Sequence, residues 1–210
     1  MSFTCLHSRT LSKILMVTLL AAFLSTACSV RQYRMKRAER LYKQGHIYIA
    51  KGELERAVEK FEESLSLSKM MDHRAGIADN MNAIGLVHMN RYEYAKARDI
   101  FMETLPLYRK LELNPEISKT LSNIASTFLG ERRFNKAISQ YEELLNWDAE
   151  TGNRLGQAIT LNNMGLIYQN HLRDTDKARE KYEEALRIFE ELGNEEYANS
   201  VRKSLATLRQ

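Results

Sequence analysis

Small and large apolar residues recur along this chain with a period of forty residues. Each copy has a large apolar residue, a small residue four positions later, and an aromatic residue or histidine three positions after that. The small positions hold Gly45, Gly85, Ala125 and Gly165. A unit of this length cannot bury its apolar face alone, so the repetition predicts an array of stacked units.

A second pattern follows each small position, in which an alanine precedes Phe or Tyr by four residues. The fourth copy lies one residue late, because the segment 170–176 holds an extra residue. Residues three and four apart share one face of an α-helix. Each unit is therefore predicted to be a hairpin of two helices that cross at the small residue, with the aromatic ring filling the space between neighbouring hairpins. The pairs are Ala57 and Phe61, Ala97 and Phe101, Ala137 and Tyr141, and Ala178 and Tyr182.

Together these two patterns resemble the tetratricopeptide repeat, whose helical hairpins carry apolar, small, aromatic and alanine positions at fixed offsets. The resemblance implies an all-α fold, an α-solenoid of four hairpins at about 38–71, 78–111, 118–151 and 158–192. A C-terminal capping helix at about 195–208 would complete this domain, which is predicted to extend over residues 38–210. Val201 and Leu205 continue the register of the first helices into the capping helix.

The forty-residue period resembles the long-repeat branch of that family, found in kinesin light chains, cell-polarity adaptors and bacterial peptide-binding regulators. It exceeds the common thirty-four residues by about a turn and a half of helix, so long helices and turns rich in Gly and Asn are expected. Pro106 falls late in a second helix. Because proline removes a backbone donor and clashes with the preceding turn, that helix is predicted to kink or end near Leu105. Pro115 is assigned to a turn between repeats.

Residues 1–27 have the pattern of a bacterial secretory signal. Arg9 and Lys13 precede a short apolar run over residues 14–24, and small residues lead to Cys28. The stretch before Cys28 resembles the lipoprotein box, which implies that this thiol is acylated and becomes the new N-terminus. Cleavage without lipid and an uncleaved anchor are the alternatives. Ser29 is compatible with sorting to an outer membrane, so the expected location is the cell envelope, on the periplasmic face of that membrane.

Residues 28–37 are predicted to form a basic tether. Six Lys and Arg residues stand against one acidic residue between Arg31 and Lys43, although the net charge of the whole chain is only +4. Nucleic-acid binding normally uses a basic stripe across a folded face or a recognisable module, whereas the basic character here is local, so no nucleic-acid partner is expected. A basic segment beside a bilayer attracts anionic head groups instead. The membrane, reached through a lipidated Cys28, is therefore a predicted partner.

No residue pattern predicts catalysis, a metal site or a cofactor. The five histidines have no partner at metal-ligand spacing, and neither Cys-x-x-Cys nor His-Glu-x-x-His occurs. Paired carboxylates such as Glu142 and Glu143 recur at the same place in each second helix, which indicates a solvated face. A protein that is not an enzyme and has no cofactor is expected; a glycan-processing helical solenoid is the enzymatic alternative.

In tetratricopeptide stacks the first helix of each hairpin lines a groove, so the resemblance also implies ligand-contacting positions. An Asn amide has two donors and an acceptor, and can bracket the backbone of an extended peptide whatever its side chains. Asn123 and Asn163 occupy the position where the long-repeat branch uses such an Asn, while the first two copies hold Lys43 and Ala83. The alternative is that these amides cap or bond between adjacent helices.

Apolar residues share the predicted groove, and for Leu86, Met89, Leu129 and Leu166 a partly core position is the alternative. The predicted groove residues are His46, Asn82, Leu86, Met89, Asn123, Ser126, Leu129, Asn162, Asn163, Leu166 and Gln169.

These features predict a non-catalytic scaffold or adaptor of the bacterial cell envelope that binds an extended or helical protein segment in its groove. The resemblance suggests envelope-complex assembly as the setting. The alternative is a membrane-anchored regulator that faces the cytoplasm and senses a peptide. Self-association through the terminal helices stays open, although Val201 and Leu205 are assigned to capping.

Overall fold

The computed structural model describes the backbone of residues 3–208 and the side chains of residue 26 and residues 28–208. The predicted signal segment, residues 1–27, therefore lies almost entirely outside the described side chains. All regular structure in the described part is helical, which confirms the all-α prediction, and the fold is a helical-repeat solenoid. The elements are α1 (Phe3–Ala50), α2 (Leu54–Met70), α3 (Arg74–Asn90), α4 (Tyr94–Lys110), α5 (Asn114–Gly130), α6 (Phe134–Glu150), α7 (Arg154–Ile167), η1 (Tyr168–Leu172), α8 (Thr175–Glu191) and α9 (Glu195–Thr207).

The chain divides into two compact units, residues 1–77 and residues 78–210. In the first unit α1 packs against α2, and Phe61 of α2 is fully buried. Its ring covers Gly45, where an added Cβ would lie 2.5 Å from the Phe61 Cε1. Ser64 donates a hydrogen bond of 2.9 Å to the carbonyl oxygen of Ala38. Together these contacts fix the crossing of the first hairpin.

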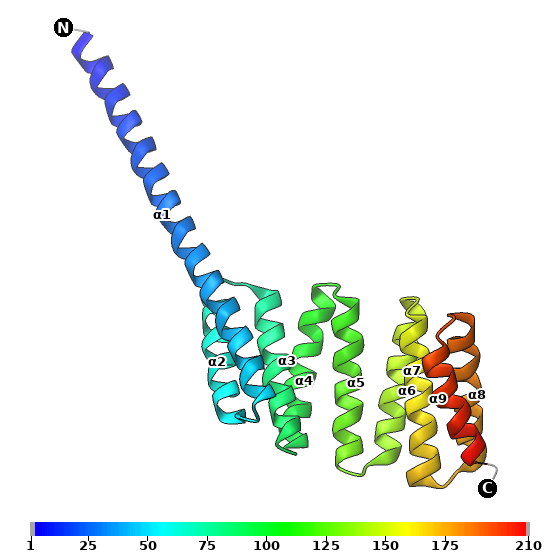
Figure 1. Cartoon of the computed structure of the whole chain (residues 1–210). Coiled ribbons are helices and arrows are strands. Elements are labelled where there is room, and N and C mark those ends of the chain that lie inside the picture. Colours follow the sequence, from blue (N-terminus) through cyan, green and yellow to red (C-terminus); the bar gives the residue numbers. More distant parts are fainter. Residues whose placement is uncertain (1–2, 209–210) are drawn as a thin grey trace. The chain divides into compact units, whose positions relative to one another are not determined.

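Residues 28–37, predicted to be a tether, are helical and belong to α1, whose N-terminal part runs beyond α2 (Figure 1). Cys28 is exposed on this helix and forms no disulfide. Within the described residues, no helix combines the length and the apolar composition required to cross a membrane.

In the second unit, consecutive helices run in alternating directions, as Figure 1 shows for α4 to α9. One core cluster extends from α3 to α7, with Phe101, Tyr108 and Leu121 buried in it. A second cluster joins α7, α8 and α9 and contains Tyr182 and Val201. Val201 is buried as the capping prediction required, and α9 covers the end of the apolar layer.

Except between η1 and α8, the turns between consecutive helices are three residues long and repeat one backbone conformation. The middle residue is left-handed, and the third donates its N–H to the carbonyl five residues earlier, as Glu93 does to His88 at 2.9 Å. This is the bond pattern of a Schellman motif, in which glycine normally takes the left-handed position. The expectation of turns rich in Gly and Asn holds only in part. The left-handed position is glycine in three turns, but Asp72, Tyr92, Glu112 and Arg132 occupy it in four others.

Pro106 was predicted to kink or end its helix near Leu105, and the predicted end is wrong. Helix α4 continues to Lys110. The carbonyl that loses its intrahelical partner belongs to Met102, four residues earlier. Met102 and Pro106 are both exposed, so this face of the helix is open to water, which can bond the freed carbonyl. Pro115 lies in the first turn of α5, where a missing backbone donor is tolerated.

The extra residue of the fourth copy is absorbed by η1, a single π-helical turn that continues α7. In the turn after η1, the N–H of Asp174 donates to the carbonyl of Tyr168, six residues earlier. The other turns use the carbonyl five residues earlier. One inserted residue widens the helix locally while α8 keeps its register, which is how π-bulges are accommodated in α-helices.

Candidate functional site

Contacts between a small residue and an aromatic ring set the positions of the first helices. A Cβ on Gly85 would lie 2.6 Å from the Phe101 Cε1, and one on Gly165 would lie 2.6 Å from the Tyr182 Cε1. Each ring thus packs on the small residue of its own hairpin. This close approach fixes the predicted groove residues of α3 and α7 relative to the second helices behind them.

The predicted asparagines lie half-buried on the first helices of the second unit. Among the described residues, the side chains of Asn123 and Asn163 form no hydrogen bond within the protein, so their amides remain available to a ligand. The Oδ1 atom of Asn82 is buried and likewise has no hydrogen-bond partner in the described part. Asn162 is half-buried beside Asn163.

The predicted apolar groove residues divide into two kinds. Leu86, Met89 and Leu129 are half-buried and pack against the larger core cluster, which agrees with the core alternative. Leu166 is different, because 38% of its surface is exposed. Leu166 is therefore the apolar residue of this set that a ligand can reach most readily.

Three predicted groove residues have contacts of their own. Gln169 accepts a hydrogen bond of 2.7 Å from the Tyr182 hydroxyl and donates one of 2.9 Å to the Thr207 hydroxyl, so it joins η1 to α8 and α9. Ser126 donates to the carbonyl of Ser122, one turn earlier in α5. His46 is exposed and belongs to the first unit, where its ring packs edge-on against Phe61.

A small pocket of about 190 Å³ opens where α7 passes into η1. Three predicted residues, Leu129, Asn163 and Leu166, line it. Its other walls were not foreseen from the sequence. They come from Tyr141 of α6, Ile167 of α7, and Asn170 and His171 of η1.

The His171 ring stacks on Phe134 with centroids 4.3 Å apart and planes 7° from parallel. The only sequence signal for this wall was the extra residue in segment 170–176. Burial raises the pKa of the Tyr141 phenol, with the Ser126 hydroxyl acting in the opposite direction, so Tyr141 is neutral at physiological pH.

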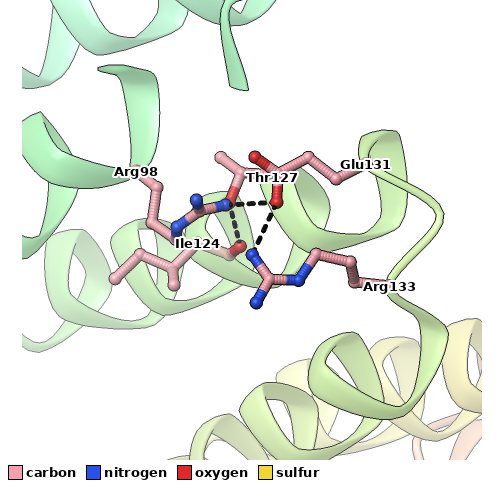
Figure 2. Close-up of polar contacts among 5 residues, drawn as sticks. All are labelled: Arg98, Ile124, Thr127, Glu131 and Arg133. Atoms are coloured by element: carbon pink, nitrogen blue, oxygen red, sulfur yellow. Dashed lines mark hydrogen bonds and ion pairs between the residues drawn. The ribbon is translucent and has the colours of Figure 1, made fainter. Parts of the chain in front are cut away.

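A polar cluster at the C-terminal end of α5 holds α4 against α5 (Figure 2). The Arg98 guanidinium donates to the Glu131 carboxylate at 2.9 Å and lies over the Phe128 ring, 4.5 Å from its centroid. Arg133 donates to the same carboxylate oxygen at 3.1 Å. Both ions of the Arg98–Glu131 pair are mostly buried, with 13% and 21% of their side-chain surfaces exposed. The pair therefore fixes the spacing of two adjacent repeats.

We expect the Arg98–Glu131 pair to weaken in acid. The hydrogen bond from Arg98 holds the pKa of Glu131 below its ordinary value. A lowered folded-state pKa gives stability that is present above the unfolded-state value, about 4.3, and is lost as the pH falls through the folded value. Glu131→Gln should lower the free energy of unfolding by about 1 kcal/mol at pH 7, and this difference should shrink towards pH 3. Urea unfolding at pH 7, 5, 4 and 3 measures it.

The matched control is Glu143→Gln, whose partner Arg109 lies at 3.1 Å in an exposed pair. Exposed pairs contribute little, so a change below about 0.5 kcal/mol is expected there at every pH. A Glu131→Gln difference that stays constant down to pH 3 would show that the charge of Glu131 does not stabilise the fold.

A second polar link joins α5, α6 and α7. Asp148 of α6 is 1% exposed, and its Oδ1 accepts hydrogen bonds from Ser118 at 2.6 Å and Asn153 at 2.9 Å. Gln157 of α7 donates to the Asp148 carbonyl at 3.1 Å. Asn153 also caps α7 by accepting from the Gly156 amide. The helices that carry Asn123 and Asn163 are thereby tied to the helix between them.

Charge is unevenly distributed over the second unit. Helices α5 and α7 together carry only Glu116, Lys119 and Arg154, all in their first halves, whereas α8 alone carries ten charged residues. Within the described residues, no group of three His, Cys, Asp or Glu side chains could hold a metal ion. The arrangement offers amides and apolar side chains to a ligand.

Comparisons with known proteins identify the repeats. Models of the family described as tetratricopeptide repeat match residues 38–69, 78–112 and 116–191. The chain is therefore a tetratricopeptide repeat protein, as the residue pattern predicted. No protein with a curated description matches it.

Solved structures share the fold at low sequence identity. Aspartyl phosphate phosphatase F from Bacillus subtilis is 14% identical, with a TM-score of 0.73 over 80% of this chain and 44% of that chain. A Rap protein in complex with competence and sporulation factor is 17% identical, with a TM-score of 0.62 over 82% of this chain and 48% of that one. BtubC from P. vanneervenii is 16% identical, with a TM-score of 0.62, covering 89% and 91%.

The chain thus spans less than half of the phosphatase and of the Rap protein. Repeats of this family typically form non-catalytic scaffolds, and the similarity supports a protein-interaction scaffold.

Proposed function

We propose that this protein binds an extended peptide or protein segment along the face formed by α3, α5 and α7 of residues 78–208. The observation that carries the proposal is the pair Asn123 and Asn163. These amides lie forty residues apart on successive first helices and form no hydrogen bond within the described protein, and Asn163 lines the pocket at η1. Two such amides can bracket the backbone of one extended segment.

Two further features support this proposal. Helices α5 and α7 carry few charged residues. An uncharged segment can therefore cover them without burying a charged side chain that lacks a partner. A Rap protein of similar fold was solved in complex with competence and sporulation factor, which supports the ability of such a solenoid to hold a partner.

Selection of a displayed heptapeptide library on the immobilised full chain tests the binding role. Enriched peptides are expected, and Asn123→Ala together with Asn163→Ala should weaken their binding about tenfold or more, because each amide loses hydrogen bonds to the peptide backbone. The matched control replaces Asn135 and Asn146, two exposed asparagines of α6, with alanine and should leave affinity unchanged. Equal binding by the two double variants would refute the role of the amides, and a library without enriched peptides would refute the function.

We also propose that Cys28 carries a lipid and that the protein is tethered to the cell envelope, with a role in assembling an envelope complex. Cys28 is exposed, and three basic residues that follow it on the same helix, Arg31, Lys36 and Arg37, are exposed as well. Basic side chains close to an anchored cysteine would meet anionic head groups.

Mass spectrometry of the mature N-terminus tests the anchor. A diacylglyceryl cysteine at position 28 is expected, and Cys28→Ala should release the protein from the membrane fraction. A mature chain that still begins before residue 28 would refute lipidation. Protease added to spheroplasts should digest the repeats if they face the periplasm, whereas protected repeats would favour the cytoplasm-facing regulator.

A further inference from the structure

The pocket at η1 has walls of two chemical kinds. Leu129, Leu166 and Ile167 supply apolar surface, and the rings of Tyr141 and His171 add aromatic surface. Carboxamides of Asn163 and Asn170 stand at the same opening. Such a combination suits a group with an apolar body that is attached to a polar backbone, because the body loses water while the backbone keeps hydrogen bonds.

The size of the pocket limits its occupant. Its volume is about 190 Å³. An engineered apolar cavity of about 150 Å³ in another protein binds benzene. One aromatic ring or one branched aliphatic group therefore fits, and two do not.

The charge around the pocket limits the occupant further. None of the lining residues is an acid, a lysine or an arginine. The charged residues of α5 and α7 lie in the first halves of these helices, whereas Leu129 and Leu166 lie near their ends. A charged side chain entering here would lose part of its hydration without gaining a counter-ion, so an uncharged side chain is favoured.

The π-helical turn creates one wall of this pocket. η1 places Asn170 and His171 at the opening, and the stacking of His171 on Phe134 holds the ring in place. Turns after the other first helices have the uniform three-residue form, so among the described repeats this wall is specific to the fourth.

We propose that the pocket at η1 is a specificity site that accepts one uncharged aromatic or branched aliphatic side chain of the bound segment. The inference rests on the proposed peptide-binding function and adds the chemistry of the anchor residue. The partner is thus a segment with a single large apolar side chain, held by its backbone along α5 and α7.

The test uses the peptides enriched on the full chain. They are expected to share one Phe, Tyr, Trp, Leu or Ile residue, and replacing it with alanine should weaken binding about thirtyfold. Leu166→Asp should weaken binding by a similar factor, with little further loss when the anchor is also alanine. Leu155→Asp is the matched control, because Leu155 lies on the same helix, is 41% exposed and does not line the pocket.

A second variant guards against a local folding defect at Leu166. His171→Ser removes an exposed wall residue and should weaken the same peptides about tenfold. The specificity site would be overturned by enriched peptides that share no large apolar residue, or by equal binding to Leu166→Asp and Leu155→Asp. In either case, binding that still depends on Asn123 and Asn163 would uphold the proposed function. A library that yields no peptide at all would overturn both.

Discussion

Gly165→Leu is expected to lower the free energy of unfolding by about 3 kcal/mol or more. A Cβ alone at this position would lie 2.6 Å from the Tyr182 ring, and leucine adds three further carbons. Tyr182 is fully buried and its hydroxyl is bonded to Gln169, so the ring has no free path outward. Overpacking of a filled core forces side chains and backbone to shift, at a typical cost of about 1–3 kcal/mol and sometimes more. Urea unfolding of both proteins measures the difference.

The third hairpin provides the control. Ala125 occupies the small position opposite Tyr141, and both residues are buried. Ala125→Gly should lower stability by less, about 1–2 kcal/mol, from the helix propensity difference and the loss of one buried methyl group.

A double-mutant cycle that combines Gly165→Leu with Tyr182→Ala isolates the contact between these two residues. Removing the ring makes room for leucine, so the double variant should be more stable than the sum of the two single effects predicts. Additive effects, or a Gly165→Leu midpoint equal to that of the native protein, would show that helix crossing does not depend on this contact.

Asp148→Ala is expected to lower the free energy of unfolding by about 3 kcal/mol. Asp148 is almost completely buried and accepts hydrogen bonds from Ser118 and Asn153. Without it, the half-buried donors Ser118 and Asn153 both lose their acceptor, and a buried polar group left without a partner costs about 1–3 kcal/mol. Thermal and urea unfolding should both show the loss.

Two substitutions sharpen the interpretation of Asp148. Asp148→Asn keeps an oxygen acceptor in the same place and should retain about half of the lost stability. Glu150→Ala changes an exposed residue of the same last turn of α6 and should have an effect below about 0.5 kcal/mol. If Asp148→Ala proved as mild as Glu150→Ala, the hydrogen bonds would not be what joins α5, α6 and α7.

The fold class was predictable because apolar periodicity reports burial directly. The same spacing that places Ala97 and Phe101 on one helix face also buries them both in the structure. The predicted helix end at Pro106 was wrong because the cost of a missing donor depends on whether the freed carbonyl faces water. Exposure at Met102 decides that, and a single sequence does not give it.

The turns were only partly predictable, because a left-handed backbone favours glycine without requiring it. Where both flanking helices are held by packing, residues such as Tyr92 and Arg132 adopt that conformation. The Gly and Asn content of these turns therefore does not reveal that they share one backbone conformation.

The polar links and the pocket were the least predictable parts. Ser118 and Asp148, or Arg98 and Glu131, are about thirty residues apart and meet only after the helices have packed. The extra residue of the fourth copy was visible in the sequence, but the stacking of His171 on Phe134 follows from the path of a π-helical turn. Asn163 and Leu166 were in the predicted groove set, whereas Asn170 and His171 were not.

Every connection between α2 and α7 uses three residues and one backbone path, whichever side chains occupy it. An in-frame copy of residues 114–153 would begin and end on geometry that its new neighbours already accept. The backbone path of the turns therefore sets no limit on the number of repeats, and the side chains at each new junction are what lengthening this chain would have to match.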